Sequence, residues 1–252
     1  MTDSGEFILC KVYGERNTGT NYFRRLCVEN TNLSFLRGGA NPKVPWLIRK
    51  CEPVRDLMCF FQFPFDLGWK HAFPPGEWAV RLSFISPASH FFVAKNPYAW
   101  LCSLHQKPYN RKQDPGEFSS FLRTPWKTLR RERAGRSQFD NPIQLWNEKY
   151  AAYLHFHRSY DFSSFLINYE TILEAPHAFV RDIAQKTGAT LTGDGIENIQ
   201  TSPKVKDVKT FSHYRDYYLN QKYLEEMDEE DVTFISSELD ASLVEDWGYR
   251  LR

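Results

Sequence analysis

The segment VYGERNTGTNYF, residues 12–23, has the glycine spacing of a phosphate-binding loop. Four residues separate Gly14 from Gly19, as in the Walker-type loop G-x-x-x-x-G-K-[ST], whose backbone N–H groups surround nucleotide phosphates. That loop ends in a lysine and a hydroxyl residue, whereas Thr20 and Asn21 stand here. We therefore expect an anion-binding turn at a helix N-terminus that does not hydrolyse ATP or GTP. The glycines alone fit a turn without a ligand equally well.

A lysine and a serine further along the chain form a second candidate anion site. The apolar stretch FFVA ends at Lys95, Pro97 can occupy the first turn of a helix, and Ser103 follows Lys95 by eight residues. Because eight residues include about two helical turns, both side chains can converge on one phosphate. A buried strand followed by an ordinary helix-start proline is the alternative.

The first segment resembles the 5′-phosphosulfate loop of sulfotransferases. In that family, P-K-S-G-T-T or P-R-S-G-T binds the 5′-phosphate of 3′-phosphoadenosine 5′-phosphosulfate (PAPS), and Thr18, Gly19 and Thr20 match S-G-T. Asn17 replaces the usual lysine or arginine, so the resemblance implies that Arg16 stabilises charge on the departing phosphate, or that Asn17 does so by hydrogen bonding. The residues implied for the 5′ side are Arg16, Asn17, Thr18, Gly19, Thr20 and Asn21.

Two further segments follow in the order of that family. FFVAKNPYAWLCS resembles the 3′-phosphate segment, in which R-[ND]-P precedes a serine, and it implies that Lys95 and Ser103 bind the 3′-phosphate. GWKHAFP resembles the K-T-H-L-P segment, whose histidine is the general base. This implies that His71 accepts the acceptor proton and that Lys70 brings positive charge to the sulfonyl oxygens. A core histidine among aromatic residues is the alternative for His71.

The resemblance extends from about residue 8 to residue 187. FLINYETILEAP is similar to the Y-E-D-L strand and turn of the family, which implies that Tyr169 lies near the adenine. The C-terminal part matches poorly, because no R-K-G occurs where many members close a basic loop over the 3′-phosphate. Arg215 is the candidate for that role.

Alternating strands and helices predict one α/β domain, residues 1–252, with a central parallel sheet flanked by helices. The resemblance implies that it is a three-layer P-loop NTPase-like fold. The predicted strands are 8–13, 65–70, 90–95 and 164–168, and the predicted helices begin at 21 and 97 or cover 142–157, 176–186 and 229–239. The polar, basic stretch 106–140 is predicted to be an insertion near the substrate entrance.

The amino-acid composition of the chain limits the kinds of partner that we expect it to bind. The chain has 32 Lys and Arg against 31 Asp and Glu in 252 residues, so its net charge does not favour nucleic acid. Five cysteines without a C-x-x-C pair predict free thiols and no metal site. No apolar run approaches the ~18 residues of a membrane span, and we expect a cytoplasmic protein.

These observations predict an enzyme that transfers a sulfonyl group from PAPS to a hydroxyl or amine acceptor, a small molecule or a glycan, without a metal. Two alternatives stay open. One is a P-loop kinase-like phosphotransferase. The other is a nucleotide-binding protein that has lost catalysis. Neither the acceptor nor the oligomeric state can be read from the sequence.

Overall fold

A sheet of four parallel strands forms the centre of the protein. The computed structural model describes residues 6–39, 51–109, 115–201 and 209–252. The strands β1 (Ile8–Gly14), β2 (Leu33–Phe35), β3 (Ser89–Ala94) and β6 (Ser164–Asn168) lie in the order β2-β1-β3-β6. All neighbouring pairs are parallel. This confirms the predicted α/β fold, and the strands expected at 8–13, 90–95 and 164–168 are present.

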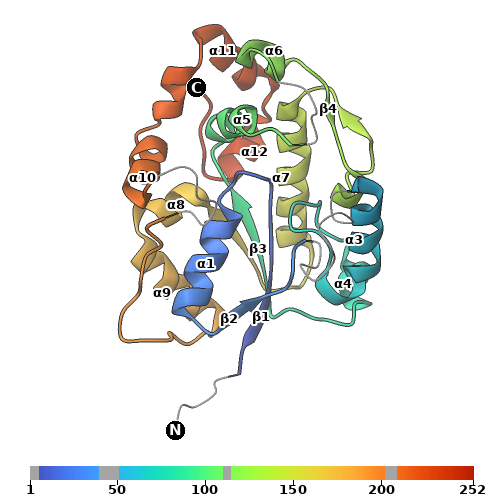
Figure 1. The fold of residues 1–252 in the computed structure, drawn as a ribbon, viewed down its shortest axis with the longest axis vertical. Coiled ribbons are helices and arrows are strands. Elements are labelled where there is room, and N and C mark those ends of the chain that lie inside the picture. The colour runs from blue at the N-terminus through green and yellow to red at the C-terminus, as the bar shows by residue number, and fades with distance from the viewer. Residues whose placement is uncertain (1–5, 40–50, 110–114, 202–208) are drawn as a thin grey trace.

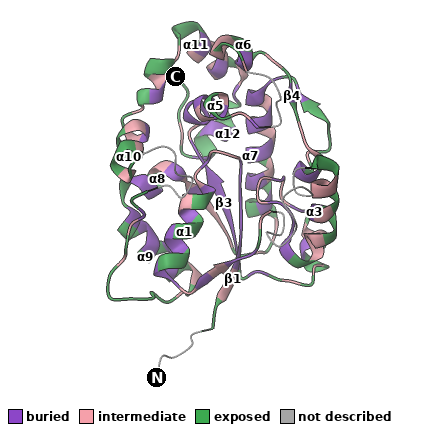
Figure 2. Ribbon diagram, in the orientation of Figure 1, coloured by how far each residue is buried: buried purple, intermediate pink, exposed green. Residues whose placement is uncertain are grey.

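Helices cover both faces of the sheet (Figure 1). Val12 of β1 packs with α1 (Thr20–Asn30) and α9 (Pro176–Thr187), whereas Tyr13 packs with α5 (Pro97–Gln106) and α7 (Pro142–Ser159). Successive strand residues point to opposite faces, so strands that are apolar throughout must be covered on both sides. The buried residues accordingly follow the strands and the inner sides of these helices (Figure 2).

The other elements surround this framework. They are α3 (Glu52–Asp66), α4 (Glu77–Arg81), α6 (Phe118–Leu122), β4 (Trp126–Lys127), η1 (Arg130–Glu132), β5 (Gln138–Phe139), α8 (Tyr169–Glu174), α10 (Phe211–Leu219), η2 (Lys222–Glu226), α11 (Glu229–Glu238) and α12 (Ala241–Asp246). Within the predicted insertion at 106–140, β4 and β5 form a separate antiparallel pair. Residues 110–114 of that stretch lie outside the described residues.

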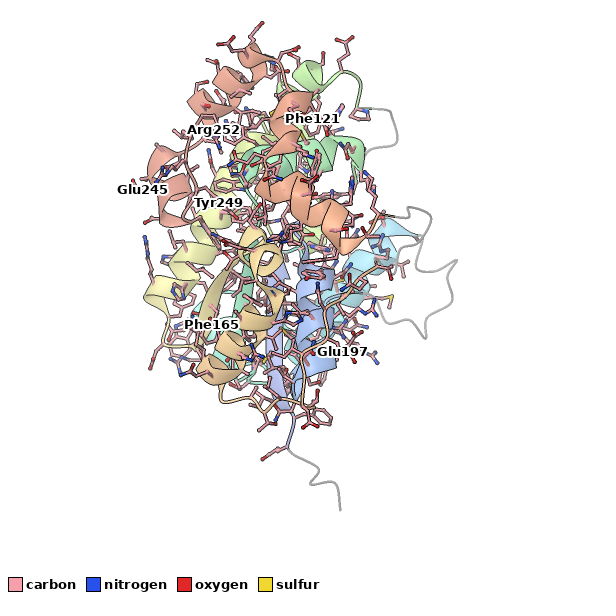
Figure 3. The ribbon with its side chains drawn as sticks, turned by 90° about the vertical axis from the view of Figure 1, so that its left-hand side faces the viewer. Phe121, Phe165, Glu197, Glu245, Tyr249 and Arg252 are labelled. Carbon is pink, nitrogen blue, oxygen red and sulfur yellow. The ribbon has the colours of Figure 1, made fainter. Side chains whose placement is uncertain are left out.

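The C-terminal segment returns to the carboxyl end of the sheet. Figure 3 shows Tyr249 and Arg252 in the upper half of the molecule, well above Phe165 of β6. The Tyr249 hydroxyl donates a hydrogen bond to the partly buried carboxylate of Glu170 (2.8 Å), which also accepts from the backbone N–H of Asn96 (3.0 Å). Asn96 is the N-cap of α5, so the chain terminus helps to fix the start of that helix.

The strand predicted at 65–70 is wrong. Helix α3 continues to Asp66, and Leu67 (φ 57°) and Gly68 (φ 80°) then turn the chain in the left-handed region. From β1, the Lys11 ammonium donates to the carbonyl oxygens of Asp66 and Gly68, and the Tyr13 hydroxyl donates to that of Leu67 (2.8 Å). A short apolar run cannot distinguish a strand from a helix end by periodicity alone.

The predicted helices are present, with one error in a helix face. The Asn141 side chain caps α7 by accepting from the backbone N–H of Gln144 (2.8 Å), and Gly188 (φ 71°) ends α9. The apolar spacing in 142–157 predicts one buried face that consists of Ile143, Trp146, Tyr150, Tyr153, Leu154 and His157. All of these are buried except His157, which is exposed, and Phe156 is buried instead.

The cysteines are unpaired, as the sequence predicts. All five cysteines are free thiols, and only Cys51 is exposed. Within the described ranges, no helix has both the length and the apolar composition that crossing a bilayer requires.

Candidate functional site

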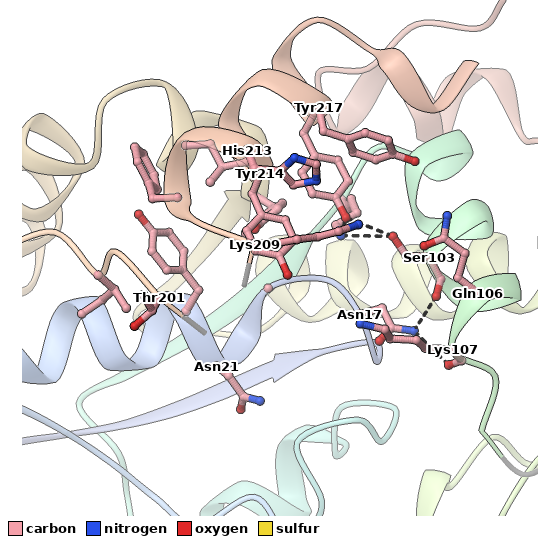
Figure 4. Close-up of a pocket in the computed structure, with 18 of the residues that line it drawn as sticks. Asn17, Asn21, Ser103, Gln106, Lys107, Thr201, Lys209, His213, Tyr214 and Tyr217 are labelled. Carbon is pink, nitrogen blue, oxygen red and sulfur yellow. Dashed lines mark hydrogen bonds between the residues drawn. The ribbon is translucent and has the colours of Figure 1, made fainter. Parts of the chain in front are cut away.

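A pocket opens at the carboxyl end of the sheet, beyond the last residues of β1, β3 and β6 (Figure 4). Its volume of about 260 Å³ is just below the roughly 300–1,000 Å³ typical of small-molecule sites. The described part of its wall comes from the turn into α1 and α1 itself, the segment from Lys95 through α5, α8, residues 199–201, and the residues around α10. Ligands of open parallel sheets bind at this end of the strands.

Most of the charged residues in the described wall of the pocket are cationic. Arg25, Lys95, Lys107 and Lys209 line it, and Glu226 is the one carboxylate among its described residues. The Glu226 carboxylate already accepts hydrogen bonds from other side chains of the wall, the Gln106 amide (2.9 Å) and the Tyr217 hydroxyl (2.7 Å). The pocket therefore favours an anionic ligand, as a local feature of a chain with almost no net charge.

The turn between β1 and α1 presents its backbone to this pocket. Gly19 (φ 85°) is the residue before α1, and Asn17 (φ 67°) also has a left-handed backbone, which asparagine tolerates better than most residues. No side chain of the described chain caps α1, in contrast to Asn96 at α5 and Asn141 at α7. The first N–H groups of α1 are therefore free of side-chain capping and can bind an anion.

Gly19 is also required for close packing. A Cβ atom added to it would lie 2.2 Å from Cδ2 of Tyr169, and that ring lines the same pocket. Any side chain at this position would have to displace the ring. The turn and the predicted adenine-side aromatic residue are thus in direct contact.

We expect Gly19→Ala to destabilise the protein more than an alanine at Gly135, which has a similar backbone (φ 73°) but open space around it. The left-handed conformation alone costs about 1–2 kcal/mol for a residue with a Cβ. The contact with Tyr169 adds about 1–3 kcal/mol at Gly19, as overpacking does. Urea unfolding of both variants measures the difference, and equal losses would show that the Tyr169 contact is not restrictive.

Lys95 and Ser103 come together as their spacing indicates. The Lys95 side chain is buried, and its ammonium lies 3.4 Å from the Ser103 hydroxyl and 2.9 Å from that of Tyr218. It also lies 4.1 Å from the ring centroid of Tyr218 and 4.8 Å from that of Tyr169. Burial raises the pKa of the Tyr218 hydroxyl, but the charge of Lys95 and the hydrogen bonds to Lys95 and Ser103 lower it overall. Among the described residues, no salt bridge joins Lys95 to a carboxylate, so an anionic ligand can be the partner of this buried side chain.

Asn17 connects the two candidate anion sites. Its side-chain amide donates to the carbonyl oxygen of Ser103 (3.1 Å) and to that of Lys107 (3.3 Å), at the C-terminal end of α5 (Figure 4). These bonds hold the Gly19 turn against the helix that carries Ser103. They give a structural reason for an asparagine where the sulfotransferase pattern has a cation.

Arg16 does not line this pocket. Its guanidinium stacks over the rings of Tyr109 (4.2 Å to the centroid) and Trp69 (4.9 Å), and its carbonyl oxygen accepts from the indole N–H of Trp100 (2.9 Å). Burial lowers its pKa, with opposing contributions from Tyr109 and Glu15. Its predicted role at the 5′-phosphate stays a prediction that needs a movement of this side chain.

His71 contacts the phosphate-loop candidate from the segment after α3. Nδ1 lies 2.6 Å from the carbonyl oxygen of Gly14, so Nδ1 carries the proton and Nε2 keeps its lone pair. Burial, followed by the positive charge of Lys70, holds the pKa of His71 well below its usual value. The imidazole is therefore neutral at pH 7, as a general base must be. Lys70 donates to the side chain of Asn21, which lines the pocket.

The remaining predicted site residues are buried in the turn or lie outside the pocket. Thr18 is buried, and its hydroxyl donates to the carbonyl oxygen of Glu15 (2.6 Å), which stabilises the turn. Thr20 is also buried. Arg215 is exposed on α10 and is not among the pocket residues, whereas Lys209 just before this helix is. Of the predicted site residues, the pocket gathers Asn17, Gly19, Asn21, Lys95, Ser103 and Tyr169.

Sequence reasoning missed a buried ion pair under the turn. The carboxylate of Glu15 pairs with the ammonium of Lys149 and accepts a hydrogen bond from the Tyr109 hydroxyl. Lys149 also donates to the carbonyl oxygen of His71 (2.8 Å). The pair thus connects the turn, α7 and the His71 segment. Nothing in the local pattern around Glu15 or Lys149 indicates it, because the residues are far apart in the chain.

Comparison with known proteins gives no family: no family model matches the chain, and no curated protein is significantly similar to it. In the part of the chain that the structure describes, no three or more His, Cys, Asp or Glu side chains are grouped to hold a metal ion. The geometry of the pocket is therefore the basis for a functional proposal.

Proposed function

We propose that this protein transfers a sulfonyl group from PAPS to a hydroxyl or amine acceptor, a small molecule or a glycan, and that its fold is of the P-loop type. One observation carries the proposal: the uncapped turn at Gly19 and the Lys95–Ser103 pair line the same pocket. PAPS has an anionic group at each end of its ribose. A pocket with two separate sets of donors, tied together by Asn17, suits a ligand with two anionic ends.

The residues present fit the nucleotide. The first N–H groups of α1 would hold the 5′ side, and Lys95 with Ser103 and Tyr218 would hold the 3′-phosphate. Tyr169 and the aromatic residues of α10 would pack on the base. The Tyr218 hydroxyl and the rings of Tyr169 and Tyr218 hold the Lys95 side chain in place for this purpose.

In the proposed reaction, His71 accepts the proton of the acceptor group. PAPS supplies an activated sulfonyl group whose S–O bond to the 5′-phosphate breaks while the acceptor oxygen or nitrogen bonds to sulfur. Nε2 of His71 accepts the proton that the acceptor loses, because Nδ1 is occupied by the Gly14 carbonyl. Lys70, beside Asn21 at the turn, contributes positive charge near the transferred group.

Kinase-type phosphotransfer fits the site less well. Magnesium would need a carboxylate beside the phosphates. Glu226, the carboxylate in the described pocket wall, is held by Gln106 and Tyr217, and Glu15 is buried against Lys149. Thr20 stands where an ATP-binding loop has its lysine.

Calorimetric titration with adenosine 3′,5′-bisphosphate and with AMP tests the nucleotide site. The bisphosphate has a 3′-phosphate that AMP lacks, and this group can form charge-assisted hydrogen bonds with Lys95. We therefore expect the bisphosphate to bind at least about 10-fold more tightly than AMP. The Lys95→Met variant should lose most of that preference. Lys186→Met, on the exposed outer side of α9, is the matched control and should keep it. Equal affinities for both ligands, or no binding of either, would contradict the proposal.

A further inference from the structure

The outer side of α3 and α4 carries an unusual number of exposed apolar side chains. We call these residues the α3–α4 surface. They are Leu57, Phe60, Phe61, Phe65, Trp78, Leu82 and Phe84, each between 55% and 78% exposed. On α3 they recur at positions i, i+3, i+4 and i+8, which is one face of a helix. The inner side of α3 is closed by residues such as Cys59.

In this surface, residues of α3 contact the segment after α4. The rings of Phe65 and Phe84 stack with centroids 5.2 Å apart, and those of Phe60 and Phe61 are 5.7 Å apart. The backbone N–H of Phe84 donates to the carbonyl oxygen of Pro64 in α3 (2.9 Å), which fixes the segment after α4 beside that helix. Both helices lie at the same edge of the molecule, remote from α10 and its pocket (Figure 1).

The size of the α3–α4 surface matches a dimer interface. A Phe or Trp side chain has an accessible surface of roughly 150–250 Å². At the exposed fractions given above, these side chains together expose about 800–1,000 Å². The largest apolar patch on a typical monomer is about 300–600 Å². A stable interface buries about 800 Å² on each partner. One further copy of this chain could therefore cover the whole surface.

The charges around this surface favour a second copy over a lipid bilayer. The Arg55 guanidinium pairs with Glu52 (2.7 Å), and that of Arg81 pairs with Glu77 (2.7 Å). Arg131 also pairs with Glu52 (2.6 Å) and Asp56 (2.8 Å) of α3, so the described charges on α3 and α4 are balanced by ion pairs and give no excess of positive charge that would bind anionic lipids. In a two-fold symmetric dimer, the apolar side chains of one copy would contact those of the other. The ion pairs of Arg55 and Arg81 would lie at the rim of the interface, where each charged residue could also pair with a residue of the other copy.

We infer that two copies of this protein associate through their α3–α4 surfaces as a symmetric homodimer. The inference does not depend on the chemistry of the pocket. Sedimentation equilibrium of the full chain between about 1 and 100 μM measures the mass directly. We expect twice the mass of one chain at the upper concentrations. A single-chain mass throughout this range would overturn the inference.

Variants locate the interface. Phe60→Asp with Phe84→Asp places two charges in the centre of the surface and should raise the dissociation constant by roughly 30-fold or more per residue. Phe7→Asp is the matched control, because Phe7 is 75% exposed on the N-terminal arm and Phe60 is 74% exposed. It should leave the mass unchanged. Trp78→Ser with Leu82→Ser is a second, uncharged pair of changes in case the aspartates impair folding, and it should also weaken the dimer.

Two results would contradict this location. The first is a dimer that both double variants leave intact, which would place the contact elsewhere. The second is a monomeric chain that co-sediments with phosphatidylcholine vesicles and loses this property in the Phe60→Asp, Phe84→Asp variant. That result would assign the α3–α4 surface to lipid.

Discussion

Replacement of His71 by asparagine should lower sulfonyl transfer by roughly 10²- to 10⁴-fold, the usual contribution of a general base. An asparagine amide can replace Nδ1 as the donor to the Gly14 carbonyl oxygen, which lies 2.6 Å from Nδ1, but it cannot accept a proton as Nε2 does. The variant therefore removes the base and keeps the local bond. Transfer is measured with radiolabelled PAPS and an acceptor found in a screen of hydroxyl and amine compounds.

The same variant distinguishes the loss of proton transfer from a loss of local structure. We expect the affinity for adenosine 3′,5′-bisphosphate to stay within about 2-fold, because His71 does not line the pocket. His71→Ala, which loses both functions, should be as inactive and also less stable. If asparagine restores the activity that alanine removes, His71 is only a positioning residue, and the proposed proton transfer is wrong.

The pH dependence follows from the surroundings of His71. Only the neutral imidazole can accept a proton, and the lowered pKa keeps it neutral to a more acidic pH than an ordinary histidine. The acid limb of kcat/KM should consequently lie below pH 6.5, the ordinary value, with no loss of activity between pH 7 and 6.5. This sign follows from burial and from Lys70, both of which disfavour the imidazolium.

The strands and the Lys95–Ser103 pair could be predicted because their geometry is local. A helix that begins at Pro97 fixes where Ser103 must lie relative to the end of β3, whatever the rest of the chain does. In the same way, the apolar stretches 8–13, 90–95 and 164–168 had to be buried between helices, whereas the three-residue strand β2 was too short to be predicted. The strand predicted at 65–70 is wrong because the aromatic residues there belong to the end of a helix and to an exposed surface.

Contacts between distant parts of the chain could not be predicted. Tyr218 reaches Lys95 across 123 residues, and Lys149 reaches Glu15 across 134. Such contacts depend on how α10 and α7 pack, and single-residue patterns carry no information about that. Arg16 shows the same limit, since its neighbour Asn17 faces the pocket while its own guanidinium stacks on Trp69.

The buried pair of Glu15 and Lys149 should dominate the stability of the turn. Their side chains are 1% and 0% exposed, so replacing one partner leaves an uncompensated charge in the interior. We expect Glu15→Gln, or Lys149→Met, to lower the free energy of unfolding by about 3–5 kcal/mol. The exposed pair of Arg158 and Asp246 is the control, because solvent screens it and Arg158→Met should leave the urea midpoint almost unchanged.

The double variant decides whether the cost comes from the pair itself. With both charges removed, no unpaired ion remains, so Glu15→Gln with Lys149→Met should be at least about 2 kcal/mol more stable than the sum of the single changes predicts. Urea unfolding of the four proteins in the cycle gives this coupling energy. Additive losses would mean that the two charges do not stabilise each other. The link from the turn through Lys149 to the His71 carbonyl oxygen would then rest on the hydrogen bond of 2.8 Å alone.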